Sequence, residues 1–299
     1  MLKSEVVIDY FRQIIPEAKP ESIVLERVGG MSNINYKICY NGLNYVLRIP
    51  GNGAEGMVER ENEELNSLLA QDMGIHPPIV YFNRKTGIKL VEYIEDAETL
   101  SQKTIQDGDN LWQIASIYKK LHNSHVRERN DFNIFHEIDK YNYLMEKAGA
   151  KMYQSYNEDS HSQCSNYYAE IIGLEHKLNK MGIDLRPCHN DGVPENFIKD
   201  RSGKIYLIDW EYSGMNDPSA ELAALFLESE FTDESRRIVL DNYYEGKVPR
   251  DTDERILIYQ ILWDYLWAQW TIIKEAKGDD FGNYGRMRYN RAMNNLKLL

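Results

Sequence analysis

The segment Cys188–Asp217 constrains this chain most, because it combines oxygen-bearing side chains at fixed spacings with a predicted hairpin. In the tripeptide HND at 189–191, Asp191 precedes Asn196 by five residues. Asp209 follows thirteen residues after Asn196, beyond two short predicted strands that are joined by the turn at 200–203. A structural turn capped by Asp and Asn side chains is the alternative interpretation of this pattern.

Protein kinases place an asparagine five residues after an aspartate and a second aspartate on the next hairpin, and the spacing here is similar. Phosphoryl transfer has a charge-rich transition state, so the protein mainly positions the reactants and neutralises charge. We therefore expect Asp191 to accept or orient the proton of an acceptor hydroxyl. Asn196 and Asp209 are expected to offer the hard oxygen ligands that Mg²⁺ prefers. Glu211 lies two residues after Asp209 on an extended segment, so it is expected to face the same side and reach a second metal or a cationic ligand.

Net charge and composition exclude several classes of binding partner for this chain. The 299 residues include 35 Lys and Arg against 47 Asp and Glu, a net charge of −12. Such a chain is a poor candidate for binding nucleic acid or anionic membranes and favours a cationic small ligand. It contains no apolar run of about 18 residues and no signal-peptide pattern, so neither membrane insertion nor secretion is expected. Three widely spaced cysteines indicate a reducing, cytoplasmic location. The residues do not indicate an oligomeric state.

The periodicity of the chain changes near residue 95. Before it, predicted strands flank the turn Asn41-Gly42, and a helix is predicted over 57–70 with Leu65, Leu68 and Leu69 facing inward. After it, helical periods dominate, over 110–125, 161–181, 218–229, 234–245 and 253–276. The sequence therefore predicts an α+β fold with a small antiparallel-sheet lobe at 1–95 and a larger, mainly helical lobe at 96–299.

The stretches HNDGVPENFI, LIDWEYSGMNDP and LAALFLESEF resemble the bacterial LicA-type choline kinases of the choline/ethanolamine kinase and aminoglycoside phosphotransferase superfamily. The resemblance extends from Gly29 to about Arg291. It implies a protein-kinase-like bilobal fold with a nucleotide-binding lobe at 1–95 and a catalytic and substrate-binding lobe at 96–299. It also implies ATP and Mg²⁺ as cofactors, and choline or a related amino alcohol as the small-molecule substrate.

The resemblance assigns nucleotide contacts in the first lobe. The segment GGMSN at 29–33 is similar to the family's nucleotide-covering loop, which implies cofactor binding by Gly30, Ser32 and Asn33. Arg48 stands where kinases place their ATP-contacting lysine, and its expected partner is an acid on the next helix. The family pattern favours Glu63, while the residues alone leave three other acids open, Glu59, Glu61 and Glu64.

The segment 91–94 resembles the hinge between lobes, where backbone groups of Glu92 and Ile94 would contact adenine.

Trp263, Trp267 and Trp270 share one face of a predicted helix, a stripe that more often packs in a core. The resemblance implies that Trp267 and Trp270, with Tyr212, form a cage that holds a quaternary ammonium by cation–π contacts beside Glu211. It places Tyr284 and Tyr289 near the same wall, both less strongly than these three residues. Trp263 is expected in the core.

The chain departs from the family pattern at Gly192, which we expect to loosen the loop after HND, and at Glu221, which lengthens a family carboxylate. Three hypotheses remain. The first is a choline kinase. The second is a kinase of ethanolamine, thiamine or an aminoglycoside, although the Trp pair disfavours aminoglycosides. The third is a catalytically dead nucleotide-binding scaffold, which the complete set Asp191, Asn196 and Asp209 disfavours.

Overall fold

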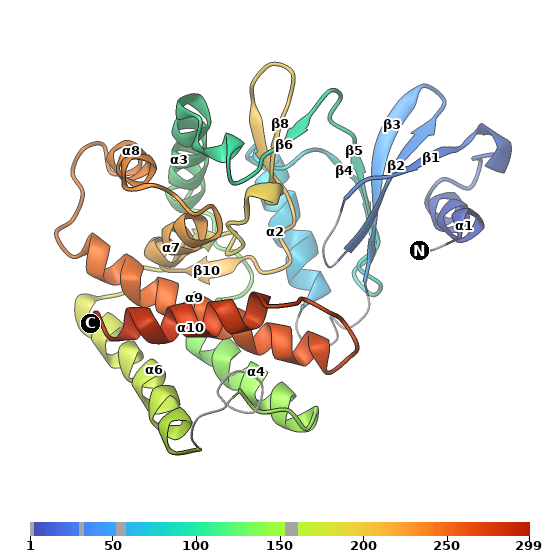
Figure 1. Cartoon of the computed structure of the whole chain (residues 1–299). Helices are drawn as coiled ribbons and strands as arrows, with labels where there is room; N and C mark the ends of the chain where they lie inside the picture. Colours follow the sequence, from blue (N-terminus) through green and yellow to red (C-terminus); the bar gives the residue numbers. More distant parts are fainter. Residues whose placement is uncertain (1–2, 30–32, 52–57, 153–160) are drawn as a thin grey trace. The chain divides into compact units, whose positions relative to one another are not determined.

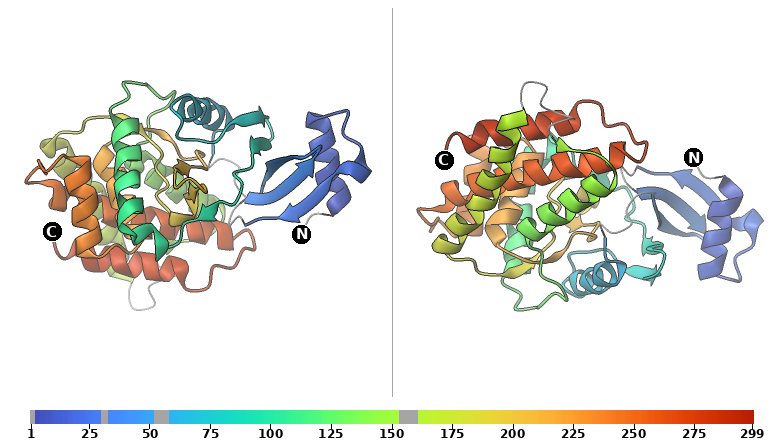
Figure 2. Two further views of the ribbon diagram at one scale, coloured as in Figure 1. Left: turned by 90° about the horizontal axis from the view of Figure 1, so that it is seen from above. Right: turned by 90° about the horizontal axis from the view of Figure 1, so that it is seen from below.

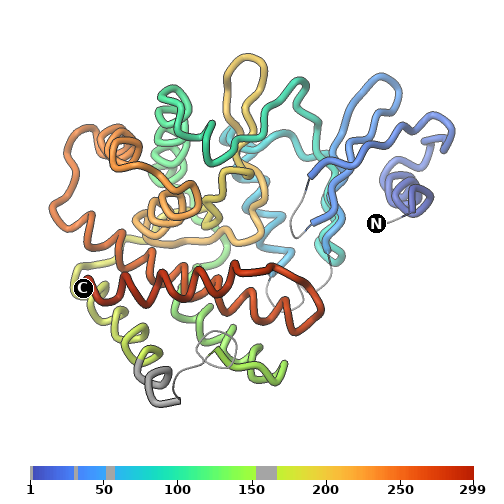
Figure 3. Tube along the Cα trace, viewed as in Figure 1, coloured from blue at the N-terminus to red at the C-terminus, as the bar shows by residue number. Residues whose placement is uncertain are grey.

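The computed structural model describes residues 3–29, 33–51, 58–152 and 161–299; the segments outside these ranges are drawn in grey in Figures 1 and 3. The chain forms two compact units. Unit 1 comprises Met1–Leu100 and Glu195–Glu211, and unit 2 comprises Ser101–Pro194 and Tyr212–Leu299. The hairpin within 195–211 thus packs with the N-terminal part of the chain, on the other side of the sequence boundary near residue 95.

Unit 1 is built on a five-stranded antiparallel sheet of order β1-β2-β3-β5-β4 (Figure 1). Its strands are β1 (Val24–Arg27), β2 (Asn33–Tyr40), β3 (Leu43–Pro50), β4 (Ile79–Phe82) and β5 (Lys89–Glu92). The hairpin between β2 and β3 turns at Asn41 and Gly42, whose φ angles of 52° and 77° are those that the Asn-Gly pair predicts. Helix α1 (Ser4–Ile14) packs beside these strands (Figure 2).

The pleat of the sheet decides which side chains serve the core and which serve the site. Leu47, Ile49 and Leu90 join Phe11 of α1 in a buried hydrophobic core. Because strand residues alternate between faces, Arg48 and its neighbour in register, Lys89, lie on the opposite face from this core. The pattern of the strands therefore places two cations side by side.

Helix α2 (Arg60–Asp72) buries a polar face. Its buried residues are Glu63, Asn66, Ser67 and Ala70, whereas Leu68 is exposed. The prediction that Leu65, Leu68 and Leu69 form the inward stripe is therefore wrong for Leu68. The reason is that ion pairs with cations of the sheet, described below, draw Glu63 inward. Unit 1 also contains a small sheet of β6 (Glu98–Thr99), β8 (Phe197–Lys199) and β9 (Ile205–Leu207), and a 3-10 turn at Pro20–Ser22.

Unit 2 is mainly helical. Its helices are α3 (Gly108–His122), α4 (Ile134–Lys147), α6 (His161–Met181), α7 (Pro218–Glu228), α8 (Asp233–Tyr243), α9 (Thr252–Glu275) and α10 (Tyr284–Leu296). Strands β7 (Arg186–Cys188) and β10 (Gly214–Asn216) pair antiparallel, and a 3-10 turn spans Thr104–Gln106. Another 3-10 turn, Pro194–Asn196, spans the boundary between the units. Helices α9 and α10 lie side by side in the views of Figures 1 and 2.

Local signals explain where these helices begin. Asn133 and Asp217 accept hydrogen bonds from backbone amides in the first turns of α4 and α7, and Pro218 occupies the first position of α7. The helices expected over 161–181, 218–229 and 253–276 are confirmed. In the part of the chain that the structure describes, none of the helices is both long and apolar enough to cross a membrane.

Candidate active site

Arg48 is the centre of an ion-pair network in unit 1. One of its guanidinium nitrogens forms an ion pair with Glu63, and the other donates to Asp209 Oδ1 at 2.7 Å. The first of these nitrogens also donates to the carbonyl of Gly87 at 3.2 Å. Burial lowers the pKa of Arg48, but the carboxylates of Glu63 and Asp209 raise it by more, so the guanidinium stays charged. The prediction that Glu63 is the partner of Arg48 is confirmed, while Glu61 and Glu64 pair with Arg84.

Glu63 is fully buried and is shared by three cations. Besides Arg48, it pairs with Arg60 at 2.7 Å and with Lys89 at 3.5 Å. Burial lowers the pKa of Lys89 to about 8, with a further contribution from the charge of Arg48. Arg60 also donates to Glu211 at 3.1 Å and so joins the helix to the segment after β9. Burial and the neighbouring Asp209 raise the pKa of Glu211 to about 7.

Asn196 precedes β8 and Asp209 follows β9, so the two residues flank the hairpin that these strands form. The amide of Ile208 donates to the carbonyl of Asn196 at 2.9 Å, which ties Asn196 to the residue before Asp209. Asp209 has a left-handed backbone with φ of 64°, a conformation that a non-glycine residue keeps only where its surroundings hold it. Its second carboxylate oxygen accepts from Asn33 at 3.2 Å. The carboxylate and amide oxygens are hard donors of the kind Mg²⁺ prefers, so this pair fits that ion.

Other nucleotide-contact predictions stay predictions. Gly30 and Ser32 lie outside the described residues. The amide of Glu92 donates to the carbonyl of Pro78 at 2.9 Å, so this N–H serves the sheet. Ile94 follows the end of β5.

Asp191 lies in unit 2, in the loop at 189–192 that we call the HND loop. The preceding Asn190 is fully buried and has a φ of 65°. Its side chain donates to the carbonyl of Tyr212 at 3.1 Å and to that of Gly214 at 3.2 Å. The amide of Asp191 donates to His189 Nδ1 at 3.3 Å, so this histidine braces the loop. The loop is therefore held at Asn190 and at the amide of Asp191 itself.

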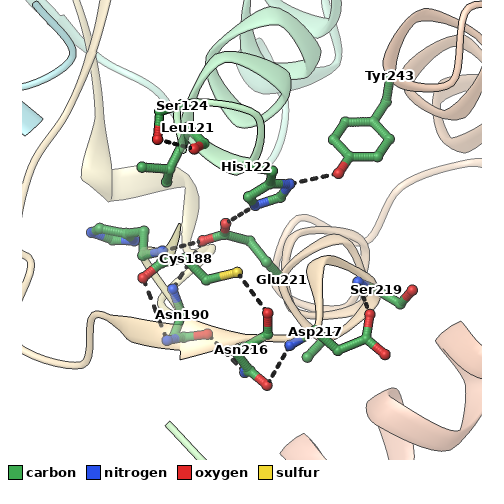
Figure 4. Close-up of polar contacts among 12 residues, drawn as sticks. Leu121, His122, Ser124, Cys188, Asn190, Asn216, Asp217, Ser219, Glu221 and Tyr243 are labelled. Atoms are coloured by element: carbon green, nitrogen blue, oxygen red, sulfur yellow. Dashed lines mark hydrogen bonds and ion pairs between the residues drawn. The ribbon is translucent and has the colours of Figure 1, made fainter. Parts of the chain in front are cut away.

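Glu221 of α7 holds the same loop through its carboxylate (Figure 4). Its Oε1 accepts from the amides of His189 at 2.7 Å and Asn190 at 2.9 Å, and its Oε2 contacts His122 Nε2 at 2.5 Å. The other ring nitrogen of His122 contacts the hydroxyl of Tyr243 at 2.7 Å. A buried carboxylate that accepts charge-assisted hydrogen bonds from successive amides fixes the backbone just before Asp191.

The potential ligand atoms of Cys188, His122 and Glu221 lie within 4.8 Å of one another, and all three residues are buried. Burial raises the pKa of the Cys188 thiol, whose Sγ donates to the carbonyl of Asn216 at 3.6 Å. Metal ligation requires the thiolate, so a protonated thiol and a direct His122–Glu221 contact indicate a hydrogen-bond network instead of a metal site.

Gly192 is tightly packed, so the expectation that it loosens the HND loop is wrong. A Cβ atom at Gly192 would lie 2.7 Å from the backbone nitrogen of Leu225 on α7. The missing side chain lets the loop approach the helix backbone closely.

Aromatic rings of unit 2 form a continuous group that we call the aromatic cluster: Tyr212, Trp267, Trp270 and Phe281. Ring centroids lie 5.5 Å apart for Tyr212 and Trp267, 6.0 Å for the Trp pair, and 4.9 Å for Trp270 and Phe281. The ammonium of Lys274 already lies 5.6 Å from the Trp270 ring centroid, so this indole accepts a cation. Trp270 is 7% exposed, and Trp267 is half-buried.

The remaining aromatic predictions have different outcomes. Trp263 is buried in the core, as expected, and its indole donates to the carbonyl of Ala220. Tyr284 is half-buried at the start of α10 and receives a hydrogen bond from Arg288 at 2.7 Å. Tyr289 is buried and stacks obliquely on Tyr265, which is a packing contact.

Sequence reasoning missed several residues of these networks. They are Arg60, Lys89, His122 as a partner of Glu221, Phe281 and Arg288. Two of them carry a local signal, since Arg60 lies one helical turn before Glu63 and Arg288 lies one turn after Tyr284. Lys89, His122 and Phe281 meet their partners through the fold.

The family model described as choline/ethanolamine kinase matches residues 24–247. The protein LicA of Haemophilus influenzae is 33% identical over 284 residues, which cover 93% of this chain and 81% of that protein. The crystal structure of the choline kinase LicA from Streptococcus pneumoniae has a TM-score of 0.85 and 37% identity, and covers 99% of both chains.

A crystal structure of LicA in complex with AMP has a TM-score of 0.84 and 37% identity, covering 98% of this chain and 97% of that one. The α+β, protein-kinase-like architecture that the sequence predicts is thereby confirmed. The chain belongs to the choline/ethanolamine kinase family.

Proposed function

We propose that this protein is an ATP-dependent choline kinase, which transfers the γ-phosphoryl group of ATP to the hydroxyl of choline and yields phosphocholine and ADP. The observation that carries the proposal is the link between the aromatic cluster and the HND loop. Asn190 donates to the carbonyl of Tyr212, and the Tyr212 ring contacts Trp267. A quaternary ammonium has no N–H to donate, so it is bound by ring faces, and choline carries its hydroxyl a short distance from that group.

Each unit supplies one half of the proposed chemistry. In unit 2, Asp191 accepts or orients the proton of the choline hydroxyl. In unit 1, Arg48 holds phosphate oxygens with a guanidinium that Glu63 and Asp209 fix in place. Asn196 and Asp209 would hold Mg²⁺, which neutralises phosphate charge when it is bound. A cytoplasmic location, where ATP is available and cysteines stay reduced, is part of the proposal.

A substrate panel tests this proposal. The purified protein is supplied with ATP and Mg²⁺, and ADP release is measured with choline, ethanolamine, thiamine and an aminoglycoside in turn. Choline is expected to give the highest kcat/KM. A higher kcat/KM with ethanolamine would identify ethanolamine as the substrate instead of choline. No ADP release with any of the four compounds, together with retained ATP binding, would favour a catalytically dead scaffold.

Asp191→Asn is expected to abolish turnover while nucleotide binding persists, because the carboxylate acts on the acceptor hydroxyl alone. Asp241→Asn, at an exposed position on α8, is the matched control. Near-normal turnover in Asp191→Asn would remove the assignment of Asp191.

Trp270→Ala is expected to raise the KM for choline roughly 2- to 30-fold, the equivalent of ~0.5–2 kcal/mol for one cation–π contact, with little change in the KM for ATP. Trp112→Ala, at an indole that is 59% exposed on α3, is the control. Equal effects on both substrates would indicate that Trp270 only packs the unit.

A further inference from the structure

Arg288 on α10 is a fully buried cation that the proposed mechanism does not use. Its guanidinium donates to Asp264 of α9 at 2.9 Å, forms an ion pair with Glu228 of α7, and donates to the hydroxyl of Tyr284 at 2.7 Å. Its Cζ lies 4.9 Å from the centroid of the Tyr284 ring. Residues of three helices of unit 2 therefore contact the Arg288 side chain, which binds Tyr284 by a hydrogen bond and a cation–π contact.

Asp264 does not depend on Arg288 for its counter-charge. Arg291, one helical turn further along α10, donates to both carboxylate oxygens of Asp264, at 2.6 and 2.8 Å. The two arginines thus share a carboxylate, but Arg288 alone also binds Tyr284. The pair offers a natural comparison, because a change at either arginine perturbs Asp264 and only one of them perturbs the tyrosine.

Stability alone is a weak reason for this arrangement. Among the described residues, the Nε–H of Arg288 has no hydrogen-bond partner although it is buried. Burying a charged group costs several kcal/mol, and buried ion pairs are often no more stable than apolar side chains of similar size. A buried guanidinium with one unsatisfied donor therefore points to a positional role.

Tyr284 connects Arg288 to the proposed substrate side. Its backbone amide donates to the carbonyl of Phe281 at 3.1 Å, and the Phe281 ring contacts Trp270 of the aromatic cluster. Burial raises the pKa of Tyr284 to about 12, and the charge of Asp191 contributes to this shift, so the phenol stays protonated. Because Arg288 donates to the phenol oxygen, the phenol's own proton is directed away from Arg288.

We propose that Arg288 is a positioning residue for the acceptor substrate. By holding Tyr284 at the edge of the aromatic cluster, Arg288 sets the affinity for the amino alcohol. Arg288 acts through Tyr284 and does not touch the substrate. The inference rests on the proposed function, because it takes the aromatic cluster as the ammonium site.

The test combines Arg288→Lys, Tyr284→Phe and their double variant with Arg291→Lys as the matched control. Arg288→Lys and Tyr284→Phe are each expected to raise the KM for choline roughly 2- to 10-fold, as the loss of one hydrogen bond predicts, and to leave the KM for ATP unchanged. The double variant is expected to show no further increase, since both changes break the same contact. Arg291→Lys is expected to leave both KM values unchanged.

Three results would overturn the inference: equal increases in both KM values, an additive double variant, or the same choline effect in Arg291→Lys. Tyr284→Phe keeps the contacts of Arg288 with Asp264 and Glu228, so it decides the question if Arg288→Lys does not fold. Titration with choline in the absence of ATP, followed by tryptophan fluorescence, measures binding without turnover. A wild-type protein that binds choline but does not phosphorylate it would refute the proposed function and still test Arg288; one that binds no amino alcohol would refute both.

Discussion

Replacing Glu221 by alanine removes three hydrogen bonds at one buried position. Two backbone amides, those of His189 and Asn190, lose their acceptor, and His122 loses the partner of its Nε2. A buried donor left unsatisfied costs ~1–3 kcal/mol, so the two amides alone predict a loss of ~2–6 kcal/mol in the free energy of unfolding. This is a large part of the 5–15 kcal/mol that is typical of a folded domain.

Glu221→Gln distinguishes the effect of the negative charge from that of the hydrogen bonds to the two amides. The glutamine keeps one oxygen for the two amides but removes the negative charge, and hydrogen bonds to charged groups are worth ~1 kcal/mol more than neutral ones. We therefore expect a smaller loss of ~2 kcal/mol in the free energy of unfolding, together with a lower kcat, because the backbone before Asp191 is held less firmly.

Urea denaturation followed by circular dichroism measures these losses, with Glu146→Ala, at an exposed position of α4, as the control. A Glu221→Ala variant within ~1 kcal/mol of this control would refute the reasoning, because it would mean that the two amides find other acceptors at no cost.

Three further predictions follow from the described contacts. Gly192→Ala is expected to cost ~1–3 kcal/mol because its Cβ would collide with the backbone of Leu225, whereas Gly173→Ala, on an open helix surface, is expected to be neutral or stabilising; equal stabilities by thermal unfolding would contradict the packing argument. Glu63→Gln is expected to destabilise unit 1 by ~3–5 kcal/mol and to raise the KM for ATP, because three cations lose a buried counter-charge. Glu61→Gln, at a half-buried residue that forms an ion pair with the exposed side chain of Arg84, should show neither effect in the same assays. Burial raises the pKa of Glu211 from its ordinary 4.5 to about 7, so between these pH values the folded state binds more protons than the unfolded state. The contribution of Glu211 to the free energy of unfolding therefore decreases as the pH rises from about 4.5 to about 7. If Glu211→Gln leaves the pH dependence of this free energy unchanged, another group is responsible.

The order of strands and helices was largely predictable, because it depends on short-range patterns. The Asn41-Gly42 turn defines its hairpin by backbone conformation alone, and the helical periods over 161–181 and 253–276 match the observed helices. Helices α4 and α10 were not predicted. Leu68 shows the limit of periodicity, since a polar face with strong partners replaced the apolar one on α2.

The sequence by itself singled out the residues to which we assign the chemistry, because the spacing of Asp191, Asn196 and Asp209 and the placing of Trp267 and Trp270 on one helix face are local features of the chain. Tertiary structure decided how those residues are held. Which of four acids pairs with Arg48 depends on how α2 packs against the sheet, in which Arg48 and Lys89 are neighbours on β3 and β5. Arg60 contacts Glu211, which lies 151 residues later in the chain. Glu221 reaches the HND loop, and Arg288 reaches Glu228, in the same way. Such contacts depend on the angle and distance at which separate elements pack, and no spacing along the chain records these quantities.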